Sequence, residues 1–316
     1  MLRTEWRVLF HLGRRPDMTA KDICTQAKLH KTKDPAPFAR GGRGRCLDYD
    51  FTHLHYRSSA TLLAMGGDPV DALRQMRMLA TDPFSGGRNF VGHYSNRGWN
   101  MCPISSPIEV QYSIAIGTAM AQRRPGCQGI TIVQGGDAGS AEGDFATCLV
   151  WSSRPGAELP ILIVVANNEW GISTPAASQH GEQHVSDRGK AFGMKTKVIN
   201  GNDPIESYIE VQRAMDYVRR ERKPFVLEAQ LSRLYGHSSS SGSNYVEEEP
   251  DCLKLFEAKL HDRGLRSRDE SAALREKLWQ YMQDESRRIK DEPQPAPESV
   301  WDHVFADENL VAEGDR

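Results

Sequence analysis

Two short groups of polar residues, each following an apolar run, carry the clearest chemical signal in this sequence. One is the turn GGDAG at 135–139, which contains the carboxylate of Asp137, and the other is the pair Asn167-Asn168. Glycines let the backbone approach a phosphate closely, and a helix N-terminus offers free N–H groups to an anion. Carboxylate and amide oxygens suit Mg²⁺, whose shell is completed by phosphates and water. Each group alone is typical of an ordinary turn, but together they predict a site for Mg²⁺ and a phosphate-bearing ligand.

The segments around these groups predict a strand–helix–strand unit that would bring them together. Apolar runs at 130–133 and 159–166 are short and rich in Ile and Val, as buried strands are. Apolar residues between the runs recur at helical spacing, namely Phe145, Ala146, Leu149 and Val150. The carboxyl ends of parallel strands open onto one crevice, where ligands of α/β sheets bind. We therefore expect Asp137 and Asn168 to lie at adjacent strand ends.

This arrangement resembles the thiamine-diphosphate signature, in which a glycine, an acid and a small-residue turn precede a double asparagine. The flanking sequences SAEGD and NNEWGISTP are similar to the alpha subunit of the decarboxylating component of 2-oxo acid dehydrogenase complexes, closest to the branched-chain type. The resemblance implies an α/β, thiamine-diphosphate-binding fold with a mostly parallel sheet flanked by helices. It implies that Asp137, Asn168 and the backbone carbonyl of Trp170 bind Mg²⁺. The cofactor-binding residues that it implies here are Gly136, Asp137, Ala138, Gly139 and Asn168.

Departures from the family pattern leave a second interpretation open. Ala138 stands where the family usually has glycine, and a turn that needs positive φ there would be strained by roughly 1 kcal/mol or more. Ala166 stands where relatives often have Arg or Glu. Val110 replaces a frequent threonine, so we expect no monovalent-cation site there. With the absence of the family's usual opening segment, these changes also fit a truncated, non-catalytic subunit.

Two further segments match the diphosphate and pyrimidine ends of the family's cofactor site. The resemblance places Tyr56 and Arg57 at the diphosphate, and the arginine fork can donate to two phosphate oxygens together. It makes His93 a catalytic pocket histidine, although a loop histidine can equally be solvated. Ser106 and the backbone of Ile108 would contact the pyrimidine end, just before a small-residue helix expected at 112–121.

The sequence RLYGHS at 233–238 resembles the family's active-site loop. The resemblance implies that Arg233 anchors this loop and that His237 contacts the diphosphate and assists acyl transfer to lipoamide. Ser238 occupies the position of a regulatory phosphorylation site in mitochondrial relatives. Ser241 and Gly242 replace acidic residues of the family. The serine-rich sequence that follows also fits a flexible linker.

Composition excludes several classes of protein. A net charge of −2 and a charged content of 26% give no footprint of a nucleic-acid partner, and no apolar run approaches the roughly 18 residues of a membrane span. The six cysteines form no C-x-x-C pair, which suits a reducing compartment and argues against structural zinc. We expect a cytoplasmic location, with the mitochondrial matrix as the alternative.

The chain divides into three parts. Residues 1–47 form an N-terminal extension and linker, of which 1–33 resemble a truncated MarR-type helix-turn-helix. Residues 48–307 form the thiamine-diphosphate-binding domain, and 308–316 form a tail. Within the domain we expect helices at 69–80, 205–222, 253–260 and 270–291, and strands at 195–199 and 224–229. The basic run 219–223 is expected to be solvated.

These features predict an enzyme that acts only with partners. The implied reaction is oxidative decarboxylation of a branched-chain 2-oxo acid, with acyl transfer to the lipoamide of an acyltransferase. The resemblance implies an assembly of two alpha and two beta chains. Thiamine diphosphate would supply the decarboxylation chemistry, and the beta chain a glutamate that this chain lacks. The alternatives are a pyruvate or acetoin dehydrogenase alpha chain, a non-catalytic subunit, or a regulatory protein built on the helix-turn-helix remnant.

Overall fold

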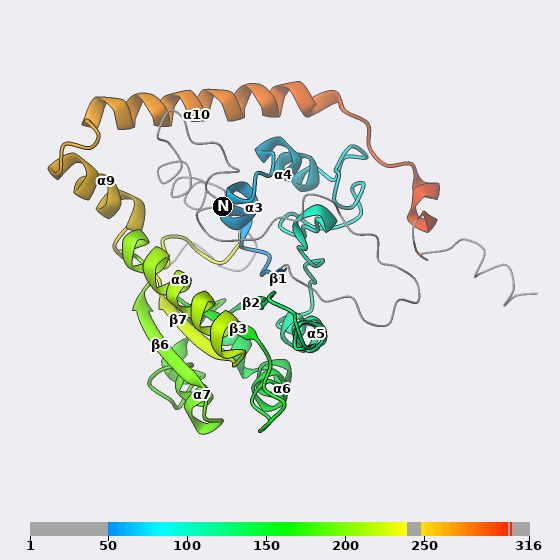
Figure 1. Cartoon of the computed structure of the whole chain (residues 1–316). Coiled ribbons are helices and arrows are strands. Elements are labelled where there is room, and N and C mark those ends of the chain that lie inside the picture. Colours follow the sequence, from blue (N-terminus) through cyan, green and yellow to red (C-terminus); the bar gives the residue numbers. More distant parts are fainter. Residues whose placement is uncertain (1–49, 239–247, 303, 305–316) are drawn as a thin grey trace, which may run out of the picture.

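The computed structural model of the chain describes residues 50–238, 248–302 and 304 (Figure 1). Three predicted features lie outside these residues. They are the N-terminal extension 1–47 with its MarR-like part, the replaced loop positions Ser241 and Gly242, and the tail 308–316.

A five-stranded parallel sheet forms the centre of the described chain. The strand order is β1-β2-β3-β7-β6. The bounds are Phe51–His53 for β1, Thr131–Gly136 for β2, Ile161–Asn167 for β3, Phe225–Gln230 for β7 and Lys195–Asn200 for β6. Four of these strands match predicted runs, whereas β1 was not predicted. The predicted α/β class with a parallel sheet is therefore confirmed.

Helices cover both faces of the sheet. On one face lie α5 (Val110–Gln122), α6 (Gly143–Ser152) and α7 (Asp187–Ala191), and on the other lies α8 (Pro204–Glu221) (Figure 1). Strand β3 divides its side chains between the faces, since Ile161 and Ile163 pack towards α5 and α6 while Leu162 packs towards α8. Burial of both faces explains why this strand reads as a continuous apolar run.

The register of the strands aligns their carboxyl ends at one edge. Gly136 of β2 pairs with Ala166 of β3, and Asn167 of β3 pairs with Gln230 of β7. The next residues along each strand, including Asp137 and Asn168, therefore leave the sheet side by side. This edge is where an open α/β sheet binds ligands.

The other helices pack around this centre. They are α3 (Ser59–Ala64), α4 (Pro69–Met76), α9 (Cys252–Asp262) and α10 (Arg268–Arg288). Helix α4 begins with Pro69 after Asp68, which accepts the Val70 N–H, and α10 begins with a capping box formed by Ser267 and Glu270. The short hairpin of β4 (Trp170–Gly171) and β5 (Thr174–Pro175) follows β3. Short 3₁₀ helices lie at Arg97–Trp99, Ala138–Ala141, Ala176–Ser178, Ile289–Asp291 and Pro297–Trp301.

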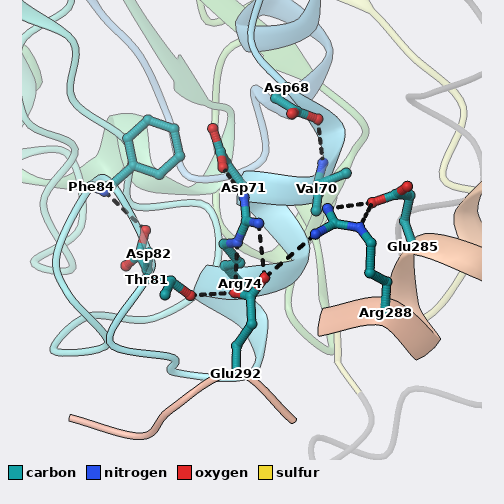
Figure 2. Close-up of polar contacts among 10 residues, drawn as sticks. All are labelled: Asp68, Val70, Asp71, Arg74, Thr81, Asp82, Phe84, Glu285, Arg288 and Glu292. Carbon is teal, nitrogen blue, oxygen red and sulfur yellow. Dashed lines mark hydrogen bonds and ion pairs between the residues drawn. The ribbon is translucent and has the colours of Figure 1, made fainter. Parts of the chain in front are cut away.

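The end of α10 is tied to α4 by a cluster of charges (Figure 2). Arg74 donates to both carboxylate oxygens of Glu292 at 2.8 and 2.9 Å, and to Asp71 at 2.8 Å. Glu292 also accepts from the hydroxyl of Thr81. Arg288 pairs with Glu285 at 2.6 Å. A bidentate arginine–carboxylate contact fixes geometry better than a single bond, so this cluster holds the long helix against α4.

The expectation that the basic run 219–223 is solvated holds for Arg220 and Lys223, which are exposed, and is wrong for Arg219 and Arg222. Arg219 forms two hydrogen bonds to Asp50, at 2.9 and 2.8 Å, and Asp50 is only 4% exposed. Arg222 donates to the carbonyls of Gln122 and Gly129. The end of α8 is thus held against the start of the sheet.

Within the described residues, no helix combines the length and apolarity that a membrane span needs.

Candidate active site

Asp137 and Asn168 meet at the adjoining ends of β2 and β3. The backbone N–H of Asn168 donates to Asp137 Oδ1 at 3.4 Å. The Asn168 side-chain oxygen accepts the N–H of Trp170 at 3.0 Å. An amide oxygen has two lone pairs, so one remains for a cation. The structure therefore brings together the three residues that the resemblance assigned to Mg²⁺.

The carboxylate of Asp137 has the features of an ion ligand. Asp137 is 3% exposed, and its Oδ2 has no hydrogen-bond partner among the described residues. Burial raises the pKa of Asp137, and nearby backbone N–H groups and His180 oppose that shift. A buried carboxylate oxygen without a partner is costly, and a bound cation would satisfy it. Within the described residues no three His, Cys, Asp or Glu side chains converge, so any ion here would also need amide and carbonyl oxygens.

Asn167 and Asn168 have different roles. Asn167 points into the protein, where its Nδ2 donates to Glu228 at 2.8 Å and its Oδ1 accepts the Glu169 N–H at 2.9 Å. Glu228 is fully buried and also accepts the N–H of Ser186 at 2.8 Å. Asn167 thus fixes the end of β3, which leaves Asn168 as the asparagine at the site.

The turn after Asp137 accepts Ala138 without backbone strain. Ala138–Ala141 form a 3₁₀ helix, and neither Ala138 nor Gly139 has a positive φ. The concern that alanine would strain this turn is therefore not borne out. The side chain of Ala138 leaves room only for a glycine at position 171, because a Cβ at Gly171 would lie 2.6 Å from the Ala138 Cβ.

Arg57 and His237, predicted at the diphosphate, contact each other. Arg57 Nη2 lies 2.9 Å from His237 Nδ1 and 2.8 Å from the His237 carbonyl oxygen. Arg57 also lies over the ring of Tyr56, 5.3 Å from its centroid. Burial lowers the pKa of His237, and the charges of Arg57 and Arg233 lower it further. His237 is therefore neutral near pH 7, and its Nδ1 accepts from Arg57 while Nε2 carries the proton.

Arg233 connects the loop of His237 to the hairpin after Asn168. Its Nη1 donates to the Ile172 carbonyl at 2.6 Å, and its backbone N–H donates to Glu249 at 2.9 Å. The guanidinium lies 5.4 Å from the ring centroid of Trp170. These contacts suit the anchoring role predicted for Arg233. The next loop residue, Ser238, is described and partly exposed.

His93 and Ser106 form a second pair. His93 Nδ1 lies 3.2 Å from the Phe90 carbonyl, which can only accept, so Nε2 is the acceptor for the Ser106 hydroxyl at 2.9 Å. His93 is 9% exposed, and the Tyr56 ring stacks parallel to it at 6.3 Å. The alternative of a solvated histidine is therefore wrong. Ile108 exposes 53% of its surface.

Three residues of this region were not predicted from the sequence. His55 accepts the N–H of Arg57 at 3.3 Å, and burial, followed by Arg57, His237 and His93, lowers its pKa to about 4. Glu109 is a buried carboxylate beside the glycine turn, and burial raises its pKa to about 7. The His180 side chain is 5% exposed with no hydrogen-bond partner for Nε2 among the described residues. His55 and Glu109 are next in sequence to the predicted site residues Tyr56 and Ile108, and this adjacency could have indicated that they belong to the site.

Comparison with known proteins identifies the family. A family profile described as "Dehydrogenase E1 component" matches residues 42–298. The chain belongs to this family. The match confirms the resemblance drawn from the sequence, the α/β cofactor-binding fold and the prediction of a 2-oxo acid dehydrogenase enzyme. The match covers most of the chain, which favours the enzyme over a regulatory protein built on the first 33 residues.

Relatives named as 2-oxoisovalerate dehydrogenase alpha subunits are similar to this chain over most of its length. The 2-oxoisovalerate dehydrogenase subunit alpha of Bacillus subtilis (strain 168) is 30% identical over 267 residues, which are 82% of this chain and 80% of that protein. The mitochondrial subunit alpha 2 of Arabidopsis thaliana is 26% identical over 265 residues, 81% of this chain and 56% of that protein. The mitochondrial human subunit alpha is 25% identical over 228 residues, 69% of this chain and 51% of that protein. The chain spans about half the length of the mitochondrial relatives that it matches.

Proposed function

We propose that this chain is the alpha subunit of a branched-chain 2-oxo acid dehydrogenase. The reaction is oxidative decarboxylation of the 2-oxo acid with transfer of the acyl group to lipoamide. One observation carries the proposal. The buried carboxylate of Asp137, whose Oδ2 has no hydrogen-bond partner in the described part of the chain, lies against Asn168 at adjoining strand ends in a dehydrogenase E1 component. The names of the relatives favour a branched-chain substrate.

The residues at this edge fit thiamine diphosphate with Mg²⁺. Asp137, Asn168 and the Trp170 carbonyl would bind the ion, and the turn with Gly136, Ala138 and Gly139 would lie against the diphosphate. Tyr56, Arg57 and His237 would also bind the diphosphate, and Ser106 and the Ile108 backbone would hold the pyrimidine. The cofactor supplies the electron sink for decarboxylation.

The chain's own residues would bind and orient that cofactor through hydrogen bonds. Arg57 offers a planar fork to phosphate oxygens and shares it with His237. His237, neutral with a proton on Nε2, can donate a hydrogen bond to a phosphate oxygen or to the lipoyl sulfur. His93 holds the Ser106 hydroxyl in a fixed direction. Phosphorylation of Ser238 would set a negative charge next to the diphosphate and lower activity.

Activity requires partner chains. A beta subunit would complete the site, in an assembly of two alpha and two beta chains, and a lipoyl-bearing acyltransferase would accept the acyl group. We place the assembly in the cytoplasm, with the mitochondrial matrix as the alternative. A pyruvate or acetoin dehydrogenase alpha chain would use the same residues, so the substrate profile of the assembled enzyme separates these alternatives.

Calorimetric titration tests the cofactor site directly. Thiamine diphosphate with Mg²⁺ is titrated into the full chain, with and without its beta chain, and into Asp137→Ala. We expect the wild-type assembly to bind the cofactor only with the divalent ion and Asp137→Ala to lose that binding. Glu276→Ala, which alters an exposed carboxylate of α10, is the matched control. Absence of binding by the wild-type assembly would favour the truncated, non-catalytic subunit.

A further inference from the structure

Glu109 lies between the two segments that would bind opposite ends of the cofactor. It directly follows Ile108 of the pyrimidine segment, and its side chain reaches the turn that contains Asp137. Glu109 Oε1 accepts the backbone N–H of Gly136 at 3.1 Å, and Oε2 accepts from Gln111 Nε2 at 3.2 Å. The residue is 2% exposed. One buried carboxylate thus joins the segment before α5 to the end of β2.

The backbone at Glu109 is held in a conformation that a glutamate rarely adopts. Its φ of 63° and ψ of 6° lie in the left-handed region, which favours glycine. Such conformations persist where the surroundings fix them, and they gather at functional sites. Here the conformation lets the side chain turn back from the start of α5 towards the glycine turn.

The glycine turn is shaped around this carboxylate. A Cβ at Gly135 or at Gly139 would overlap with atoms of the Glu109 side chain. These glycines flank Asp137 on both sides, so the glutamate contacts the turn before and after the expected metal ligand. The absence of side chains at both positions is therefore explained by Glu109 as well as by the approach of a phosphate.

We propose that Glu109 is a positioning residue that fixes the diphosphate-binding turn relative to the pyrimidine-binding segment. The inference rests on the proposed function, because it assigns the two segments to the two ends of one cofactor. Both carboxylate oxygens accept hydrogen bonds within the chain, which suits a clamp rather than an acid–base group. Thiamine diphosphate spans both segments and benefits from their fixed spacing, whereas magnesium pyrophosphate occupies only one.

The test compares these two ligands by calorimetry on the full chain assembled with its beta subunit. In Glu109→Ala, the dissociation constant for thiamine diphosphate with Mg²⁺ should rise about 10- to 100-fold, as expected when buried hydrogen-bonding groups lose their partner. The dissociation constant for magnesium pyrophosphate should change by less than about 3-fold, because that ligand does not need the spacing. A general loss of stability would weaken both ligands alike.

Conservative and control variants separate the clamp from folding. In Glu109→Gln the amide oxygen can still accept the Gly136 N–H, so this variant should recover part of the lost affinity. Amide hydrogen exchange in a peptide covering 134–142 should be faster in Glu109→Ala than in wild type and nearly normal in Glu109→Gln. Glu276→Ala, with its exposed carboxylate, should leave both ligands and the exchange rate unchanged.

The outcomes distinguish the clamp from the proposed function. If wild type binds thiamine diphosphate no better than magnesium pyrophosphate, the proposed function is wrong and the inference fails with it. If wild type prefers thiamine diphosphate but Glu109→Ala weakens both ligands equally, or neither, the function stands and the clamp is overturned. If Glu109→Ala does not fold, Glu109→Gln decides. It keeps an acceptor for the Gly136 N–H but loses the acceptor for Gln111 Nε2, so it should weaken the binding of thiamine diphosphate about 3- to 10-fold more than the binding of magnesium pyrophosphate. Equal weakening of both ligands in Glu109→Gln would overturn the clamp.

Discussion

Arg57 and His237, which lie 180 residues apart in the chain, are joined by two hydrogen bonds from a single guanidinium nitrogen. Both residues were assigned separately to the diphosphate by resemblance, and the structure brings them into direct contact. Burial lowers the pKa of His237, and the charge of Arg57 lowers it further, so both favour the neutral histidine. The guanidinium also has N–H donors on Nη1 and Nε. Arg57 can therefore bind a phosphate with these donors while its Nη2 holds the loop of His237.

Replacing Arg57 should therefore affect cofactor affinity in a graded way. Arg57→Lys keeps the charge but cannot donate through a planar fork, and we expect a loss of about 10-fold in affinity for thiamine diphosphate. Arg57→Ala removes a charged hydrogen-bond donor and should cost about 100-fold. Calorimetric titration of the assembled protein measures both. Arg154→Ala, at a partly exposed arginine that stacks on Trp151, should bind as wild type does.

Arg219 should contribute to stability through its pair with Asp50. Asp50 is 4% exposed, so removal of Arg219 leaves a nearly buried carboxylate whose remaining hydrogen bond, among the described residues, comes from the N–H of Ile130. We expect Arg219→Ala to lower the free energy of unfolding by about 1–3 kcal/mol, less than for a fully buried pair because Arg219 is itself partly exposed. Arg213→Ala removes the exposed partner of Glu210 and should change the free energy of unfolding by less than about 0.5 kcal/mol. Chemical denaturation measures both, and equal effects would contradict the assigned role.

The contact of Arg74 with Glu292 should give acid-dependent stability. Arg74, followed by Thr81, lowers the pKa of Glu292 from 4.5 to about 2. A lowered carboxyl pKa means that the folded state favours the ionised form, so the contribution is complete above about pH 4.5 and is lost as the pH falls towards 2. The difference in melting temperature between wild type and Glu292→Gln should therefore be largest near neutral pH and shrink below pH 4.5. A difference that is constant with pH would show that the charge of Glu292 has no part in it.

The sequence predicted those elements whose residue pattern matches their burial. Strand β3 is buried on most of both faces, and β2 is buried on one face and partly buried on the other; their apolar runs predicted both strands. Strand β1 has the sequence FTH, and its buried polar residues Thr52 and His53 hid it, because His53 is satisfied by Thr118 from a distant helix at 2.9 Å. A strand of this kind depends on partners that no local pattern reveals.

The candidate site was predictable where a motif exists and hidden where single residues act through distant partners. Asp137 and Asn168 came from spacing across one strand–helix–strand unit. Glu109 carries no motif, and its burial follows only from the packing of α5 against the turn. Likewise Arg219 lies in a run of charges that is usually solvated, and only its partner Asp50 gives it a buried role. Tertiary contacts override local patterns in these cases.

Residues 1–33 should be dispensable for catalysis. Their sequence differs abruptly from the rest, and the family match begins at residue 42. We expect a chain that lacks them to give an assembly with wild-type turnover on a branched-chain 2-oxo acid. Turnover with lipoyl domain as the acceptor measures this. A large loss would assign the extension a part in assembly or catalysis.

His237 should act mainly on acyl transfer. It is held by Arg57 and lies on the loop anchored by Arg233, and its Nε2–H can donate a hydrogen bond to the lipoyl sulfur on which negative charge develops during acyl transfer. A preorganised donor of this kind contributes about 10²–10³-fold, and His237→Ala should reduce acyl transfer to the lipoyl domain by about that factor.

Decarboxylation measured with an artificial electron acceptor should be partly retained in His237→Ala, because that assay bypasses the lipoyl group. The control is His261→Ala, whose histidine binds Ser271 in the C-terminal helices. Both assays should be unchanged in that variant. Wild-type acyl transfer by His237→Ala would mean that the loop serves only as a connection and that the resemblance assigned His237 the wrong role. A loss of both assays to the same degree would instead place His237 at the cofactor alone, as a donor to the diphosphate that every step needs.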